Sequence, residues 1–267
     1  MQALTLAILA FILYIAAASW QGLALTHRLP QNPLLVRSMG AFGLIFHLAL
    51  IIVLAELGAL SASSLSTSAI LLGALVVLLL ILVSLFKPVL NAAVALFPLA
   101  GVTLLLSVGL NGTDQGSSMI TPGIALHALS SALAFAVLSI AAVQAVIFGL
   151  QNQALRHHRT RGIVQSLPPL TTVERILFEL IWAGMALLTV SIASGILFLD
   201  NLFAQHLAHK TILSLAAWVI FATLLFSHHR LGWRGMRAVR WTLGGCAILL
   251  LAYFGSKFVL EVLINRG

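Results

Sequence analysis

Long apolar segments alternate with short polar ones along the whole chain. Eight segments of about 17–28 residues are almost entirely hydrophobic, whereas a helix needs roughly 20 residues to cross a bilayer. They lie at about 2–20, 38–58, 67–86, 89–110, 123–150, 173–199, 211–227 and 241–262. Backbone groups in lipid must find partners within their own segment, so such segments are expected to be helices. The pattern predicts an all-α, polytopic membrane helix bundle with about eight transmembrane helices.

The composition agrees with a chain that is surrounded by lipid. Charged residues make up only 7% of the 267 residues and hydrophobic residues 61%. Soluble domains carry roughly 25% charged residues. Because no polar stretch is long enough for a soluble domain, residues 1–267 are expected to form a single integral membrane domain. The net charge of +8 does not indicate nucleic-acid binding, since the basic residues are spread over short loops between apolar segments.

The distribution of basic residues predicts an orientation. Of the 14 Lys and Arg residues, 11 fall in or at the edges of alternate loops: those after the first, third, fifth and seventh segments. The remaining loops contain three acidic residues and one basic residue: Glu56, Asp114, Asp200 and Lys210. Loops that are rich in Lys and Arg stay in the cytoplasm. The pattern therefore predicts that both termini lie outside the cytoplasm (N-out, C-out).

Histidines are the main candidates for chemistry, since the chain has nine of them. His47 lies well inside the second segment, about 15 Å from Arg37 at about 1.5 Å per residue along a helix. An ionisable side chain near the middle of a membrane is costly and is by default a functional hypothesis. The alternative is a neutral histidine that is hydrogen-bonded between helices.

Four other histidines lie at the ends of apolar segments. His127 is near the outer end of the fifth segment, and His228 ends the seventh on the cytoplasmic side, where it is a possible partner of His47. His206 and His209 precede the seventh segment and share one face if that part is helical. The alternative for each is an ordinary histidine at the membrane interface.

Three kinds of chemistry use histidines within a membrane. Imidazole nitrogens from facing helices can bind haem iron axially, and histidines can relay protons in a transporter. A divalent metal site is ranked third, because such sites usually add carboxylates or thiolates. The single cysteine, Cys246, excludes a Cys-x-x-Cys motif and with it the usual covalent attachment of haem. No nucleophile is paired with a base and an orienting group, so the sequence indicates no enzymatic reaction.

Several motifs resemble a known family. The stretch His209-Lys-Thr-Ile-Leu-Ser-Leu-Ala-Ala-Trp-Val-Ile-Phe and the later His228-His-Arg-Leu-Gly-Trp-Arg-Gly-Met-Arg-Ala are similar to the cytochrome c assembly family. That family includes CcsA, CcmC and the HemX-like or YpjD-like inner-membrane proteins. The segment from Thr121-Pro to His127 and the stretch Ala252-Tyr-Phe-Gly-Ser-Lys-Phe are similar as well. The likeness covers roughly residues 40–262 and is strongest to the YpjD-like branch.

This resemblance implies a multi-pass protein of the cell inner (plasma) membrane that binds haem b non-covalently and assists cytochrome c assembly or haem handling. It implies membrane haem ligands at His47 and His228, and an outer ligand at His127. Full synthases carry a tryptophan-rich outer segment, whereas the matching loop here, from Asp200 to His209, has no tryptophan. His206 or His209 is then the expected second outer ligand, and the protein is not a complete haem lyase.

The partners implied by the resemblance are haem, the lipid bilayer and other cytochrome assembly proteins. Two other functions agree with the residues alone. A small-solute transporter would use His47 and Glu179 as polar elements of a pathway. A regulatory membrane protein would act through its basic inner loops and perform no chemistry.

Overall fold

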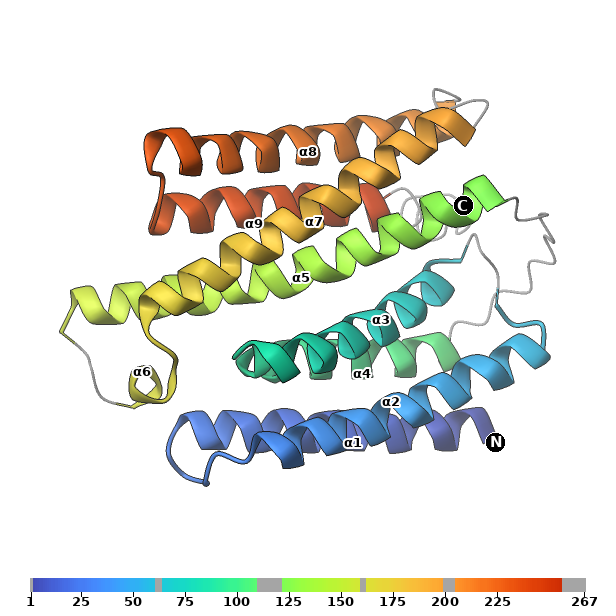
Figure 1. Cartoon of the computed structure of the whole chain (residues 1–267). Helices are drawn as coiled ribbons and strands as arrows, with labels where there is room; N and C mark the ends of the chain where they lie inside the picture. Colours follow the sequence, from blue (N-terminus) through green and yellow to red (C-terminus); the bar gives the residue numbers. More distant parts are fainter. Residues whose placement is uncertain (1, 61–63, 110–121, 159–161, 199–204, 256–267) are drawn as a thin grey trace, which may run out of the picture. The chain divides into compact units, whose positions relative to one another are not determined.

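The computed structural model describes residues 2–60, 64–109, 122–158, 162–198 and 205–255, and this part of the chain is built from helices (Figure 1). Eight of the described helices are long and apolar enough to cross a membrane, which confirms the predicted fold class. Asp114 and Asp200, which support the predicted orientation, lie outside the described residues. The N-out, C-out orientation stays a prediction.

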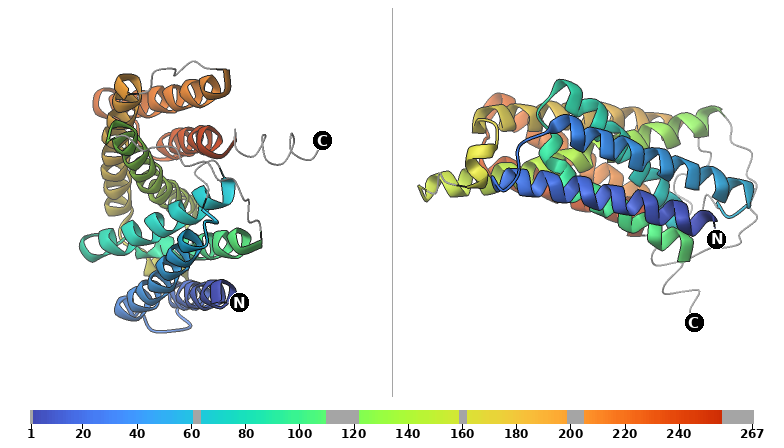
Figure 2. Two further views of the ribbon diagram at one scale, coloured as in Figure 1. Left: turned by 90° about the vertical axis from the view of Figure 1, so that its right-hand side faces the viewer. Right: turned by 90° about the horizontal axis from the view of Figure 1, so that it is seen from below.

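The helices fall into two compact units. The first contains α1 (Gln2–Leu25), α2 (Pro33–Glu56), α3 (Leu65–Phe86), the 3-10 turn η1 (Leu90–Ala92), α4 (Ala93–Gly109) and the short α6 (Ile163–Ser166). The second contains α5 (Pro122–Arg156) as far as Asn152, α7 (Leu170–Phe198), α8 (Gln205–Leu231), α9 (Met236–Leu250) and the π-helical turn η2 (Leu251–Gly255). In the first unit α1 packs along α2 and α4, and in the second α8 packs against α7 and α9 (Figure 2).

Small residues allow the helices of the first unit to approach closely. The buried face of α1 carries Ala7, Ala10 and Ala17 at helical spacing, with Tyr14 between them. The ring of Tyr14 lies against Gly43 of α2, where an added methyl group would be 2.7 Å from a ring carbon. Small residues at helix contacts are typical of membrane bundles, whose helices associate through close van der Waals packing.

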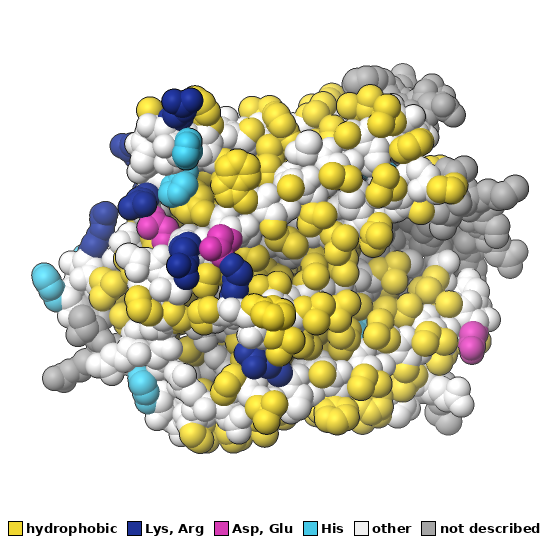
Figure 3. All heavy atoms as spheres, viewed as in Figure 1, with side chains coloured by type: hydrophobic (Ala, Val, Ile, Leu, Met, Phe, Trp, Pro, Cys, Tyr) yellow, Lys and Arg dark blue, Asp and Glu magenta, His cyan; other side chains and the backbone are white. Residues whose placement is uncertain are grey.

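The outer faces of the helices are apolar. On α2 the side chains of Phe42, Ile45, Leu48 and Ile52 are exposed, and they lie on a different face from the buried His47. Figure 3 shows such apolar side chains along the helices of both units. A soluble protein rarely exposes a continuous apolar surface of this kind, so these faces suit contact with lipid.

Several helices extend beyond the predicted apolar segments. α2 begins at residue 33 and not 38, and the side chain of Asn32 caps it by accepting a hydrogen bond of 3.1 Å from the backbone N–H of Leu35. A charge interrupts an apolar run in the sequence, but the long stem of an arginine can lie along a helix. The following arginines, which were assigned to inner loops, lie within helix ends: Arg37, Arg156, Arg175, Arg230, Arg237 and Arg240.

Candidate functional site

His47 lies in the middle of α2 and is completely buried, with 0% of its surface exposed. Its Nδ1 is 3.1 Å from the hydroxyl oxygen of Tyr14 on α1. Its Nε2 is 3.1 Å from the backbone carbonyl oxygen of Ile70 on α3. The imidazole therefore connects three helices of the first unit.

These partners determine which nitrogen of His47 carries the proton. A carbonyl oxygen only accepts, so Nε2 carries the hydrogen and donates it to Ile70. Nδ1 then accepts the hydrogen of the Tyr14 hydroxyl, and the ring is neutral. Both nitrogens are occupied in this arrangement, so His47 would have to give up one hydrogen bond before it could bind a metal ion.

The space around His47 is filled. The ring of Tyr14 packs on that of Phe97 at 5.5 Å between centroids, and Phe97 lies against Gly40. On the far side, Gly73 of α3 faces the His47 ring, and a methyl group there would lie 3.5 Å from Cε1. The first unit thus holds His47 as a packed, hydrogen-bonded residue of its core.

His228 lies near the end of α8 in the second unit and is half-buried. Its Nδ1 is 2.7 Å from the backbone carbonyl oxygen of Trp233, so Nδ1 carries the hydrogen and donates it. Its ring stacks on Phe178 of α7, with 3.5 Å between centroids and 17° between planes. Nε2 of His228 has no hydrogen-bonding partner among the residues that the structure describes. Among the described residues, no group competes with a ligand for the lone pair of this nitrogen.

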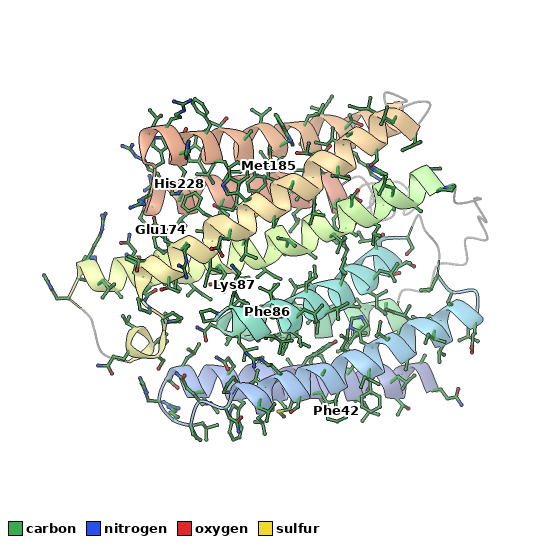
Figure 4. The ribbon with its side chains drawn as sticks, viewed as in Figure 1. Phe42, Phe86, Lys87, Glu174, Met185 and His228 are labelled. Atoms are coloured by element: carbon green, nitrogen blue, oxygen red, sulfur yellow. The ribbon has the colours of Figure 1, made fainter. Side chains whose placement is uncertain are left out.

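The loop after α8 supplies the carbonyl group that binds His228. Gly232 and Gly235 both have positive φ angles, 66° and 65°, which glycine adopts without steric cost. The backbone N–H of Trp233 donates to the carbonyl of Ser227 at 3.2 Å. The backbone N–H of Gly235 donates to Oε1 of Glu174 on α7 at 3.1 Å. Figure 4 shows Glu174 and His228 at the same end of the second unit.

His127 has an arrangement similar to that of His228. It is half-buried in the second turn of α5, and its Nδ1 is 2.8 Å from the carbonyl oxygen of Ser191 on α7. The Ser191 hydroxyl is 3.5 Å from the same nitrogen. Nδ1 therefore donates to the carbonyl, and Nε2 has no partner within the described part of the chain.

The four predicted haem ligands do not form one cluster. His228 and His127 contact Phe178 and Ser191, which lie about 20 Å apart along α7 at about 1.5 Å per residue. His47 belongs to the other unit, so its pairing with His228 stays a prediction. The side chain of His209 lies outside the described residues, as does that of His206. Within the described ranges, no three His, Cys, Asp or Glu side chains are close enough to hold a metal ion together.

Sequence reasoning missed the groups that orient the histidines. The carboxylate of Glu174 accepts a hydrogen bond from the loop after α8, and no motif in the sequence singled it out for such a role. Tyr14 could have been noticed as a hydroxyl inside an apolar segment. The carbonyl groups of Ile70 and Trp233 leave no signal in the sequence, because every residue has one.

The whole chain is similar to one protein family. The model of the family described as Cytochrome C assembly protein matches residues 3–264. This match covers both compact units and all eight candidate transmembrane helices.

Individual relatives point in the same direction. Inner membrane protein YpjD of Escherichia coli (strain K12) is 36% identical over 143 residues, which are 54% of this chain and 54% of that protein. Protein HemX of Brevibacillus brevis is 23% identical over 58% of each chain. Cytochrome c biogenesis protein CcsA of Gloeobacter violaceus is 28% identical over 36% of this chain and 29% of that protein. The chain thus spans about half the length, or less, of these curated relatives. No solved structure matches it significantly.

Proposed function

The chain belongs to the cytochrome c assembly protein family, and from this premise we propose that it is a multi-pass inner-membrane protein that binds haem. Haem b would be bound non-covalently, and the protein would assist cytochrome c assembly or the handling of haem. Its similarity to an inner membrane protein and its eight apolar helices support this location. We do not assign it the activity of a complete haem lyase.

The orientation of His228 carries the proposal. A histidine that binds a metal usually donates its other ring N–H to a carbonyl or carboxylate, which fixes the tautomer and the ring orientation. His228 does this through Nδ1 and Trp233, which leaves Nε2 for iron. The stacked ring of Phe178 supplies an apolar wall at the same place. Both features suit a histidine that would bind haem iron.

His47 is the proposed second ligand in the membrane, and it could bind iron only after one of its two hydrogen bonds is broken. The nitrogen that binds iron must first release Tyr14 or the Ile70 carbonyl. If Nδ1 were the ligand, Nε2–H could keep its bond to Ile70 and hold the ring in place. That exchange would retain the oriented second nitrogen that metal-binding histidines have.

The outer site would use His127, with His209 as its proposed second ligand. His127 already has its Nδ1 bound to Ser191 and its Nε2 available. It contacts α7 far from His228, so it would serve a separate haem. In each case the protein would supply an oriented imidazole whose nitrogen would donate its lone pair to the haem iron.

One observation favours a different function. His47 is buried and fully hydrogen-bonded, as expected of a residue with a purely structural role. A regulatory membrane protein without a cofactor would need no more from it. The two functions differ in whether any histidine binds iron.

The deciding experiment is an absorption spectrum of the detergent-purified protein, produced with a haem precursor supplied and recorded oxidised and reduced. We expect a Soret band and sharp reduced α and β bands, which are typical of low-spin iron with two histidine ligands. His228→Ala should weaken these bands, and His229→Ala is the matched control, since His229 is exposed on the same helix end. A wild-type protein that stays free of haem under these conditions would contradict the proposal and leave transport or regulation.

A further inference from the structure

The loop between α8 and α9 is held by groups from two helices, α8 and α7. It contains only residues 232–235, and two of these are glycines with positive φ. Trp233 donates its N–H to Ser227 and accepts the Nδ1–H of His228. Gly235 donates its N–H to Glu174. The carbonyl group that orients His228 therefore lies in a loop whose last residue is hydrogen-bonded to α7.

α7 contacts both His228 and its loop. Glu174 and Phe178 are four residues apart, so they lie on the same face of this helix. Phe178 stacks on the His228 ring and sets its plane. Glu174 fixes Gly235, which is two residues from the carbonyl of Trp233. Together they determine the ring plane and the position of the group that accepts from Nδ1.

The carboxylate of Glu174 is well suited to this task. It is half-buried, and a charged acceptor binds an N–H more strongly than a neutral one. Gly235 is also the N-cap of α9, and no side chain of its own helix caps this end. A negative charge at the start of a helix is favourable because the helix dipole is positive there. Glu174 thus links α7 to the first turn of α9.

We propose that Glu174 is a positioning residue for His228, acting through Gly235 and the carbonyl of Trp233. It keeps the loop in place, so that Nδ1 of His228 stays protonated and Nε2 stays free for an axial ligand. The role in haem ligation rests on the proposed function, whereas the effect on the tautomer of His228 does not. Glu174 itself touches no ligand in this scheme.

The first test uses the haem-free, full-length protein labelled with 15N-histidine. The His228 signals are identified by their loss in His228→Gln. We expect the wild type to contain the Nδ1–H tautomer, and Glu174→Ala to give a mixture of tautomers. Glu174→Gln keeps an oxygen that can accept from Gly235, so it should restore the wild-type signal. An unchanged His228 signal in Glu174→Ala would overturn the positioning role.

A second variant tests the connection between Gly235 and Glu174 from the side of the loop. Gly235→Ala places a Cβ where nothing lies within 4 Å, so its main effect is on a backbone with φ of 65°. It should shift the His228 tautomers in the same direction as Glu174→Ala. Glu179→Ala is the matched control on α7, since Glu179 is exposed and pairs with Arg175 at 3.8 Å. The control should leave the His228 signal unchanged.

Haem titration separates this role from the proposed function. Loss of a group that orients a metal ligand typically weakens metal binding about 10–100-fold. We expect such a loss in Glu174→Ala and recovery in Glu174→Gln. If the wild type binds haem and Glu174→Ala binds it equally well, the positioning role in ligation is wrong while the proposed function stands. If the tautomer changes but the wild type binds no haem, the proposed function is wrong and Glu174 orients His228 for another purpose.

Discussion

Tyr14 donates its phenolic hydrogen to Nδ1 of His47 over 3.1 Å, and this bond joins α1 to α2 inside the first unit. His47 continues the connection to α3 by donating from Nε2 to the carbonyl of Ile70. Tyr14 and His47 are both 0% exposed. Removal of either side chain would leave a buried polar atom without its partner. A buried donor or acceptor without a partner costs about 1–3 kcal/mol.

Tyr14→Phe should destabilise the protein by about 1–3 kcal/mol, because Nδ1 of His47 loses its donor while the packing is nearly conserved. The measurement is the unfolding transition of the purified protein in detergent. Tyr253→Phe is the matched control. Tyr253 is the other tyrosine of the chain, and its described contacts are the rings of Phe135 and Phe254. Its replacement should have little effect, and equal losses in both variants would contradict the importance of the Tyr14 hydrogen bond.

The same variant also tests His47 as a haem ligand. If Nδ1 binds iron, Tyr14 competes with iron for this nitrogen, so Tyr14→Phe should raise the affinity for haem. If His47 is purely structural, haem binding by other residues should not change. Haem titration followed at the Soret band distinguishes these outcomes. A lowered affinity in the folded variant would contradict competition by Tyr14.

Gly43→Ala should destabilise the protein because the added methyl group would clash with a neighbouring ring. Its Cβ would lie 2.7 Å from a carbon of the Tyr14 ring, closer than two carbons can approach, so α1 and α2 would have to separate. Overpacking of this kind typically costs about 1–3 kcal/mol. Gly244→Ala on α9 is the control, because nothing lies within 4 Å of the new methyl group. Alanine there should be neutral or should stabilise the helix by about 0.5–1 kcal/mol. Unfolding midpoints in detergent give both values.

His127 and His228 should act independently. Their contacts on α7 are about 20 Å apart, so one haem iron cannot bind both. In a wild-type protein with both sites filled, His127→Ala and His228→Ala should each remove part of the bound haem, and the losses should add in the double variant. The ratio of haem to protein, measured as a pyridine complex, provides the test. Complete loss of haem in either single variant would argue for one shared site.

The fold could be predicted from the sequence because lipid imposes a simple rule. Any segment of roughly 20 apolar residues is expected to be a helix that crosses the bilayer, wherever it lies in the protein. The ends of the segments were less certain, as Arg37 illustrates. It lies inside α2 and donates to the hydroxyl and carbonyl of Ser84 at the end of α3. Because Ser84 on α3 binds the guanidinium group, α2 can include the charged Arg37. A hydropathy pattern contains no information about such a partner.

The sequence pointed to candidate histidines but not to the groups that bind them. The sequence singled out His47, His127 and His228, and each is bound by a group on another element or loop. Which nitrogen is free could not be predicted, because it depends on a carbonyl or hydroxyl that packing brings within about 3 Å. His47 and His228 differ in this respect because Tyr14 occupies the second nitrogen of His47. Hydrophobic patterns predict how deep a residue lies in the membrane, but they do not predict how its helix is rotated relative to the neighbouring helices.

The predicted orientation can be tested with single cysteines introduced after Cys246→Ala. Leu57→Cys lies in the exposed turn after α2, and His158→Cys in the exposed segment after α5. The positive-inside rule places position 158 in the cytoplasm, since Arg156, Arg159 and Arg161 lie between the fifth and sixth apolar segments, and it places position 57 outside. In intact cells whose outer membrane has been permeabilised, a charged maleimide should label Leu57→Cys and not His158→Cys. After lysis it should label both. The reverse result would place both termini in the cytoplasm, and His127 would then lie at an inner site, where an outer haem could not bind.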